Sequence, residues 1–446
     1  MLIEVKQGLD VLLAGAPEQA IFPGRAVTRV AVLGLEHVDL RASLRVAEGD
    51  AVTMGQTLFV DRAEPRVRFV APAAGRVVEI HRAARRRLQA VVLALDEDAP
   101  DIAEAEAKVS SGPIATLARQ AICTALCEAG LWPALRARPY GHIAPVDGVP
   151  GALFVTAIDT QPGAADPRVV IAARSDDFRS GLEVLARLAP RTWLCTAPGA
   201  ELPCPDCEGL QAVAFAGPHP AGLVGTHVRH LHADGGTVWH VGYQDVLAIG
   251  HLFRTGTLTS ERVVAVAGPG VHSPQLVRTR LGADLTELLA GEIVPSARVL
   301  GGSVLSGRDL SPASGFLGRF EQQVTVLADP PGGVRRFGFA RALRALLMPT
   351  GSVDRAALRS ARVDTATHGL PSGMLPVEAF DRVWPFDAPP APLLRALLIR
   401  DTETASSLGC LALAEEDLAL CAYVCPAKLD YGAALRDTLR ELERGR

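Results

Sequence analysis

The sequence predicts a multidomain protein of mixed α/β and α+β class. Its 446 residues are too many for one ordinary hydrophobic core. Hydrophobic residues make up 48% and charged residues 21% of the chain, a balance typical of folded domains rather than of disorder. The apolar pattern also changes type along the chain, which indicates successive domains at residues 1–105, 106–257, 258–330 and 331–446.

Residues 1–105 are predicted to form a β domain of the barrel-sandwich type. The segments 44–61 and 71–94 each contain a strand, a glycine turn and a second strand, and two such half-units pack as a flattened barrel. The phrases EGDAVTMGQTL and APAAGRVVEI resemble biotinyl and lipoyl carrier domains. Those carriers present a modified lysine on a hairpin tip, but no lysine lies between Phe59 and Arg76. We therefore expect the scaffold without the swinging-arm chemistry.

Residues 106–257 are predicted to form a Rossmann-like α/β layer. An acidic linker at 96–113 precedes a helix expected at about 114–129. Strand-like apolar runs then alternate with helical ones, as a parallel sheet requires. These are the strands 152–159, 192–197 and 210–217 and the helix 180–189.

Residues 258–330 turn β-rich again, with the runs RVVAVAGPGV, ARVLGGSVLSG and QQVTVLAD. They predict a compact β-grasp-like domain of the SLBB kind. Residues 331–446 are predicted to be mainly helical from about Pro376, with amphipathic segments and Asp401 as a helix N-cap.

The bulk composition excludes several functions. The net charge of −4 argues against nucleic-acid binding, and Arg85–Arg87 is interpreted as a solvated face. No stretch approaches the roughly 18 uncharged apolar residues that a membrane span needs, and the N-terminus lacks a signal-peptide core. The 8 cysteines are scattered, so reduced thiols are expected. We expect a cytoplasmic protein that meets a membrane only by docking on other subunits.

Cys421 and Cys425 form the first candidate site. A ferredoxin run reads C-x₂-C-x₂-C-x₃-C-P. Cys421, Cys425 and the following proline match its end, whereas Glu415 and Leu418 stand where the first two ligands belong. Two thiolates cannot hold a cubane cluster. The motif therefore indicates a degenerate ferredoxin-like helical domain, in which buried structural thiols are favoured over a retained metal or thiol role.

Two further groups of possible ligands are weaker. Cys204 and Cys207 have thioredoxin or half-zinc spacing, but no second C-x-x-C accompanies them, so two free thiols in an exposed loop are favoured. The chain also has a run of histidines without an H-E-x-x-H motif, and no metal site is expected from it. These are His219, His227, His230, His232, His240 and His251.

The loop GPHPAGLVGTH at 217–227 is the last candidate. It follows a predicted strand, where α/β folds place ligands, and its glycines allow a backbone to approach a phosphate or a flat ring. It is neither G-x-G-x-x-G nor a P-loop, so a tight structural turn is the alternative. A pocket for a flat ligand such as a quinone is predicted to use His219, Gly222, Gly225 and Thr226.

Together these segments resemble the A-type subunit of the sodium-translocating NADH:quinone reductase (Na⁺-NQR) over nearly the whole chain. This family is related in domain order to the large soluble subunit of the Rnf complex and to the flavin-binding NADH subunit of complex I. The resemblance rests on MLIEVKQGLDVLLAGAPEQ, VAPAAGRVVEI, FVTAIDTQPGAADP, HPAGLVGTHV, TVWHVGYQDVLAIG, RVVAVAGPGV, SVLSG and GCLALAEEDLALCAYVCPAKLDYG.

The resemblance implies a peripheral subunit on the cytoplasmic side of the bacterial inner membrane, without a catalytic activity of its own. Its partners would be the other subunits of a six-subunit complex, above all the membrane subunits. That complex oxidises NADH, reduces ubiquinone to ubiquinol and moves Na⁺ out of the cytoplasm, and its flavins and iron–sulfur centre lie in other subunits. Pro218 and Pro220 interrupt the flavin-type loop, and prolines lack the N–H donors that a phosphate needs. Two hypotheses stay open, a quinone-associated subunit and a purely structural docking subunit.

Overall fold

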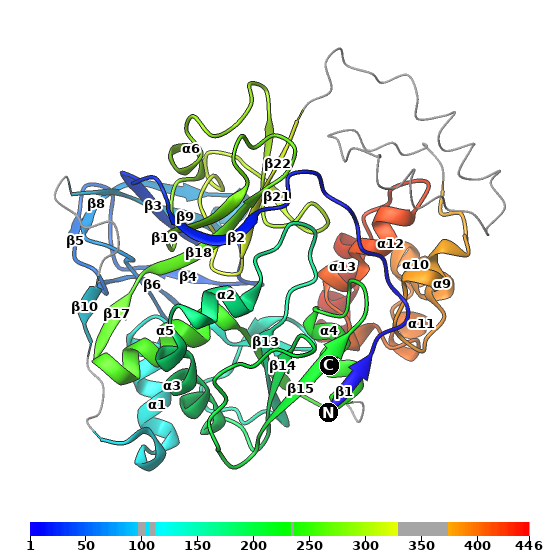
Figure 1. Ribbon diagram of the computed structural model, residues 1–446, viewed down its shortest axis with the longest axis horizontal. Helices are drawn as coiled ribbons and strands as arrows, with labels where there is room; N and C mark the ends of the chain where they lie inside the picture. Colours follow the sequence, from blue (N-terminus) through cyan, green and yellow to red (C-terminus); the bar gives the residue numbers. More distant parts are fainter. Residues whose placement is uncertain (97–103, 108–111, 233–235, 329–372, 446) are drawn as a thin grey trace.

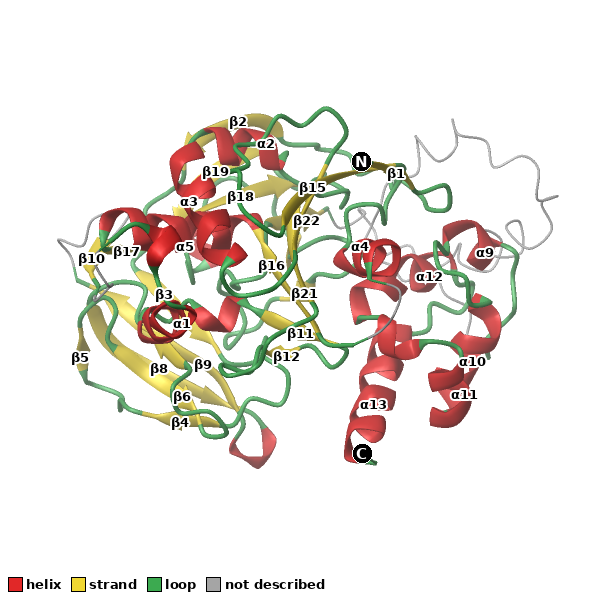
Figure 2. Cartoon of the chain, turned by 90° about the horizontal axis from the view of Figure 1, so that it is seen from below, coloured by secondary structure: helices red, strands yellow, loops and turns green. Residues whose placement is uncertain are grey.

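The computed structural model describes residues 1–96, 104–107, 112–232, 236–328 and 373–445. Figure 1 shows a β domain and a helical domain at opposite sides of the molecule, with an α/β domain and a second β domain between them. Figure 2, seen from below, shows the same separation of the C-terminal helices from the first β domain. Residues 331–372 of the predicted fourth domain lie outside the described residues.

Two small antiparallel sheets make up the first β domain. One has the order β3-β9-β8-β5 and the other β4-β6-β7. Apolar side chains such as Leu58, Phe59 and Leu93 are fully buried in its core. The strands are β3 (Arg29–Leu33), β4 (Ala42–Leu44), β5 (Ala51–Val52), β6 (Thr57–Asp61), β7 (Arg68–Val70), β8 (Gly75–Arg82) and β9 (Leu88–Leu95).

The first two strands, within residues 1–23, pair with other sheets and not with the two sheets of this domain. β1 (Leu2–Glu4) pairs in parallel with β15 (Leu210–Ala216), and β2 (Glu18–Pro23) pairs in parallel with β19 (Gln275–Arg280). Edge strands join a sheet through backbone hydrogen bonds, which leave no distinctive side-chain pattern. The N-terminal segment thereby ties the α/β domain to the second β domain.

The α/β domain is built on a seven-stranded sheet in the order β1-β15-β14-β13-β16-β11-β12. In this order, the strands β1, β15, β14, β13 and β16 run parallel to one another. β11 runs antiparallel to β16, and β12 runs antiparallel to β11. The predicted strands at 152–159, 192–197 and 210–217 are all present. The bounds are β11 (Arg136–Arg138), β12 (His142–Ile143), β13 (Ala152–Ala157), β14 (Thr192–Thr196) and β16 (Val238–Gly242).

Both faces of this sheet are covered. Leu153 and Val155 of β13 join the core under the helices α3 (Ser175–Ala186) and α5 (Tyr243–Thr255). Phe154, between them, joins a separate core that includes Val224 of α4 (Val224–Leu231). This alternation follows from the two-residue repeat of a strand. A ligand therefore has access to the sheet only at its ends.

Other helices complete this layer. The predicted helix at 114–129 is shorter and forms α1 (Arg119–Glu128) after a single 3₁₀ turn at Ile114–Thr116. The one predicted at 180–189 begins earlier, as α3. α2 (Pro167–Ala172) begins at a proline and is capped by Asp166, which accepts a hydrogen bond from the backbone N–H of Arg168.

A short ribbon joins the two ends of the α/β domain. β10 (Glu104–Glu106) pairs antiparallel with β17 (Thr257–Thr259), so the predicted boundaries near 105 and 257 lie side by side. His251 of α5 contacts both strands of this ribbon. Its Nε2 lies 3.1 Å from the hydroxyl of Thr257 in β17 and 3.5 Å from Glu104 Oε1 in β10. The two segments that flank the main part of the α/β domain are thus held together.

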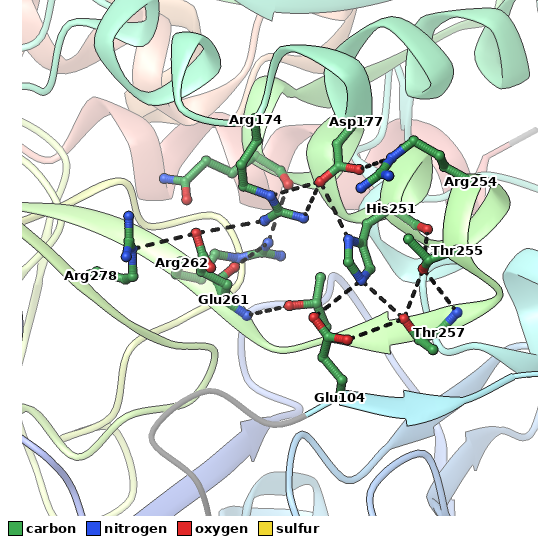
Figure 3. A network of polar contacts seen from close by, with 12 residues as sticks. Glu104, Arg174, Asp177, His251, Arg254, Thr255, Thr257, Glu261, Arg262 and Arg278 are labelled. Atoms are coloured by element: carbon green, nitrogen blue, oxygen red, sulfur yellow. Dashed lines mark hydrogen bonds and ion pairs between the residues drawn. The ribbon is translucent and has the colours of Figure 1, made fainter.

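A polar network above this ribbon links α3 to α5 (Figure 3). The buried carboxylate of Asp177 lies 2.9 Å from Arg174 Nη2, 2.8 Å from Arg254 Nε and 3.4 Å from His251 Nδ1. Burial acts to raise the pKa of Asp177, but the hydrogen bonds from His251, Arg254 and Arg174 outweigh it and lower that pKa. Asp177 is therefore ionised and holds the two helices together.

The second β domain is a mixed sheet in the order β2-β19-β18-β22-β20-β21. β18 (Glu261–Ala267) and β19 form a hairpin, and β18 pairs in parallel with β22 (Gln323–Leu327). The remaining elements are α6 (Leu285–Leu288), β20 (Arg298–Gly301) and β21 (Arg308–Asp309).

The described C-terminal residues are helical and have their own core, which contains Cys410, Cys421, Cys425 and Tyr431. Asp401 caps α11 by accepting a hydrogen bond from the N–H of Thr404, as predicted. The helices are α9 (Ala379–Val383), α10 (Pro390–Ile399), α11 (Thr402–Ser407), α12 (Ala419–Val424) and α13 (Tyr431–Arg444). A 3₁₀ helix, η5 (Glu415–Leu418), precedes α12.

We predict that Gly250→Ala is strongly destabilising. A Cβ at Gly250 would lie 1.7 Å from the carbonyl oxygen of Asp177, so α3 and α5 would have to separate. Such overpacking costs about 1–3 kcal/mol or more, and urea denaturation should show this loss in the free energy of unfolding. Gly373→Ala is the control, because its Cβ meets nothing within 4 Å. Equal stability of both variants would contradict the close helix contact.

We also predict that Asp177→Asn lowers stability at neutral pH by about 1.5–3 kcal/mol, because it weakens the charge-assisted hydrogen bonds from Arg174, Arg254 and His251. The lowered pKa of Asp177 sets the sign of the pH dependence. Its contribution is complete above the ordinary carboxyl pKa and is lost as the pH falls through the lowered pKa. Urea denaturation of both proteins at several pH values, from pH 7 to strongly acid pH, measures the difference between their free energies of unfolding. Asp176→Asn, exposed in the same helical turn, should change little.

Candidate functional site

A cavity of about 1200 Å³ opens where all four parts of the chain meet. Its walls include Glu36 of the first β domain, Asp159 and Tyr243 of the α/β domain, Arg308 of the second β domain and Glu416 of η5. Small-molecule sites commonly occupy such junctions. We take this cavity as the candidate functional site.

The carboxyl ends of the parallel strands form the floor of the cavity. Asp159 follows β13, Tyr243 follows β16, and Gly222 lies in the loop between β15 and α4. Open α/β sheets bind their ligands at this edge, because the loops there are free to vary while the sheet holds them in place. The fold therefore brings together residues that are far apart in the sequence.

A cationic wall stands next to this floor. Arg136 and His240 are directly paired across β11 and β16, and Arg138 follows on the same strand as Arg136. Burial, then the charges of Arg136 and Arg138, hold the pKa of His240 well below its usual value, so that imidazole stays neutral. Arg136 lies 4.3 Å from the ring centroid of Phe320, which also lines the cavity.

The opposite wall is the acidic segment of η5. Glu415 accepts hydrogen bonds of 2.6 and 2.9 Å from Arg436 of α13. Glu416 and Asp417 face Arg138 of β11 at 3.4 and 3.5 Å. The pairs with Arg138, together with a hydrogen bond from Arg436 to the carbonyl of Tyr140, join the helical domain to the α/β domain.

Two carboxyl groups on the remaining wall, those of Glu36 and Glu321, have raised pKa values. Burial, and then the neighbouring carboxylate of Glu321, raise the pKa of Glu36 to about 7. Burial also raises the pKa of Glu321 itself, although Arg308 lies 2.7 Å away and opposes the rise. Glu36 consequently titrates near neutral pH.

The four loop residues predicted from the sequence have different environments. Gly222 lines the cavity, and His219, Gly225 and Thr226 do not. His219 is buried with its Nδ1 3.0 Å from Thr160 Oγ1, and burial lowers its pKa to about 4. Thr226 donates a hydrogen bond to the carbonyl of Pro220. His219 and Thr226 therefore support the loop rather than line the predicted pocket.

Gly225 has a packing role. A Cβ there would lie 2.3 Å from both carboxylate oxygens of Asp417. The glycine thus admits a carboxylate of the same chain. Gly222 also faces a close neighbour, because its Cβ would lie 2.7 Å from the backbone nitrogen of Thr160.

Cys421 and Cys425 are fully buried, and Cys425 Sγ lies 3.3 Å from the hydroxyl of Tyr431. Burial raises the pKa of Cys421 to about 12, which keeps it a thiol. At the two degenerate positions, Glu415 pairs with Arg436 and Leu418 is buried. This environment fits structural thiols.

Cys204 is exposed and Cys207 half-buried, and burial raises the pKa of both. The histidines noted in the sequence are spread over the 219 loop, α4, β16 and α5. Within the described part of the chain, no three His, Cys, Asp or Glu side chains are placed to hold a metal ion.

Sequence reasoning missed Arg138, Asp159, Tyr243 and Glu416. Asp159 had a usable signal, since it directly follows a predicted strand and strand ends carry ligands in α/β folds. Arg138 and Glu416 had none, because their meeting depends on how two domains dock.

The topology defines a multidomain subunit in which barrel-sandwich, α/β and β-grasp-like domains surround one cavity. Family profiles agree with this class: residues 3–96 match the NqrA N-terminal barrel-sandwich hybrid domain, residues 117–258 the NqrA second alpha/beta domain, and residues 263–311 the NQRA C-terminal domain, of SLBB type. These matches confirm three of the four predicted fold types.

Full-length relatives give the particular family, the NqrA subunits of Na⁺-translocating NADH-quinone reductases. The NqrA subunit of Shewanella denitrificans is 45% identical over 99% of this chain and 100% of its own length. The Pseudomonas aeruginosa protein of the same name is also 45% identical, and that of Rhodopirellula baltica 41%. The chain belongs to this family, and is thus a subunit of an oxidoreductase complex.

A chain of an NAD⁺-reducing nickel–iron hydrogenase matches 75% of this chain and 62% of its own, at 14% identity and a TM-score of 0.37. That likeness is too low to bear on function. Among the helices that the structure describes, none has the length and apolar character to span a bilayer.

We predict that Gly225→Ala weakens the packing of η5 against α4. The new Cβ would overlap Asp417, which must then withdraw from α4, at a cost of about 1–3 kcal/mol. Hydrogen exchange of residues 415–424 should become faster. His230→Ala, at an exposed position of the same helix, is the control. Unchanged protection in Gly225→Ala would show that the contact does not hold the domains together.

Proposed function

We propose that this chain is a peripheral subunit on the cytoplasmic face of the Na⁺-translocating NADH-quinone reductase, and that its cavity receives the quinone head group. The observation that supports this proposal is that two hydrogen-bond donors at the cavity have no partner. Tyr243 OH and Arg136 Nε are buried and have no hydrogen-bond partner among the residues described. Buried polar groups nearly always have a partner, so a ligand with acceptor atoms would complete them.

The shape and chemistry of the cavity suit a quinone. Ile158, Leu223 and Leu305 give part of its lining an apolar character that fits a ring and the start of an isoprenoid tail. Burial, followed by the charge of Asp159, raises the pKa of Tyr243, so its hydroxyl remains a donor. Two carbonyl oxygens of a quinone would accept from such donors.

We further propose that the subunit binds no flavin or iron–sulfur centre and that its helical domain derives from a ferredoxin-like one. Leu418 has no donor atom for iron, and Glu415 is engaged by Arg436. Prolines 218 and 220 lack the N–H groups that cradle a phosphate. Stoichiometric flavin or iron in the purified subunit, seen by absorbance, would contradict this.

The alternative is a purely structural docking subunit that binds no ligand. It is favoured by the number of cavity charges that are already paired, such as Asp245 with Arg262 at 2.5 Å and Arg308 with Glu321. Such pairs stiffen a junction between domains without requiring a ligand.

We predict that Tyr243→Phe weakens binding of a short-chain ubiquinone about 3–10-fold, because one hydrogen bond contributes about 0.5–1.5 kcal/mol. Equilibrium titration of the purified subunit measures this. The variant should be no less stable than wild type, because the hydroxyl that it loses has no partner.

Tyr140→Phe is the matched control. The hydroxyl of Tyr140 is also buried and unpartnered, yet that residue does not line the cavity. Its loss should leave quinone affinity unchanged. Absence of saturable quinone binding by the wild-type subunit would favour the docking alternative. Equal affinities for all three proteins would show that the Tyr243 hydroxyl does not contact the quinone.

A further inference from the structure

Asp159 is the carboxyl group at the centre of the cavity floor. It lies beyond the end of β13, which is the central strand of the seven-stranded sheet, and it lines the cavity. Its Oδ1 accepts a hydrogen bond of 2.8 Å from the backbone N–H of Gln161, which fixes the orientation of the carboxyl group. The placement aims one rigid carboxyl group at whatever occupies the cavity.

Its neighbours leave Asp159 without a cation of its own. No Lys, Arg or His in the described ranges forms an ion pair with it, whereas Arg138 is held by Glu416 and Asp417. Glu416 of η5 and Tyr243 of α5 are titratable groups that line the same cavity, and the charge of Glu416 acts on Asp159. A half-buried carboxyl group with an acidic neighbour and no counter-ion favours its protonated form.

We propose that Asp159 donates the protons that the quinone takes up when it is reduced in this cavity. The inference rests on the proposed function. Reduction of a quinone to a quinol adds two electrons and two protons. NADH supplies the electrons through the other subunits of the complex. For each proton, the O–H bond of Asp159 breaks, an O–H bond forms on a quinone oxygen, and a carboxylate is left.

Glu416 connects Asp159 to water. Its side chain is 30% exposed, so it exchanges protons with solvent, and it lines the same cavity as Asp159. The carboxylate of Asp159 regains a proton from water along this path after each transfer. Arg138, whose Nη2 lies 3.4 Å from Glu416 Oε1, restrains that carboxylate at the cavity wall.

The pH dependence follows from the protonation of Asp159. Burial, and then the charge of Glu416, raise the pKa of Asp159 to about 6. The donor form is therefore abundant at pH 6 and falls about tenfold for each further pH unit well above it. Where proton transfer limits turnover, quinone reduction should slow along the same curve.

The test uses the assembled, purified complex with Asp159→Asn, Asp159→Glu and the exposed control Asp206→Asn. Asparagine keeps the acceptor for the Gln161 N–H but has no acidic proton. Quinone reduction at pH 6 should fall about 100-fold in Asp159→Asn, in line with a general acid. The residual rate should lose its pH dependence and its solvent deuterium isotope effect. Asp159→Glu should recover part of the rate, and Asp206→Asn should match wild type.

Two further measurements separate the possible failures. NADH oxidation with ferricyanide, which takes electrons but no protons, should be equal in all four proteins and shows that the complex is intact. Short-chain ubiquinone should bind the isolated wild-type and Asp159→Asn subunits equally well. If quinone binds both and the rate and pH profile do not change, Asp159 is not the donor. If quinone does not bind the wild-type subunit, the proposed function is wrong, and the role of Asp159 as proton donor is wrong with it.

Discussion

The covering of both faces of the central parallel sheet is the constraint on which the rest of the structure depends. α3 and α5 bury one face and α4 the other, so the backbone of the inner strands is sealed from water. Functional groups can then be presented only at the ends of the strands, and in open α/β sheets the carboxyl ends serve this role. The other domains meet around this edge, and the cavity is the space that they leave above it.

Charge pairs decide how the helical domain meets this edge. Glu415, Glu416 and Asp417 carry three adjacent acids into a partly buried junction, which is unfavourable unless cations meet them. Arg436 and Arg138 supply those cations from α13 and β11. Glu415 stands at a position where a cluster cysteine would lie, and there it pairs with Arg436 inside the helical domain. Arg436 in turn donates a hydrogen bond to the carbonyl of Tyr140 in the α/β domain, so Glu415 acts on the domain junction only through Arg436.

Local structure could be predicted from the sequence, and long-range placement could not. The strands at 152–159 and 192–197 and the Asp401 cap follow from periodicity and capping within a few residues. The pairing of β1 with β15 joins segments that are far apart in the chain, and no local pattern encodes it. The glycine loop illustrates both cases. Its position at a strand end was correct, whereas Gly225 proved to accommodate Asp417, which depends on a domain almost two hundred residues later.

The contact between Asp417 and Gly225 also bears on what the cavity can accept. A helix N-terminus attracts anions, and in this fold it is the natural place for a phosphate. Here the carboxylate of Asp417 already occupies the space beside the first turn of α4. A phosphate-bearing ligand would have to displace it and would meet prolines in the preceding loop. An uncharged acceptor that uses Tyr243 and Arg136 needs no such displacement. The blocked anion position therefore supports a quinone over a nucleotide as the occupant, and it makes the uncharged state of Asp159 chemically relevant, because only its protonated form can give a proton to such a ligand.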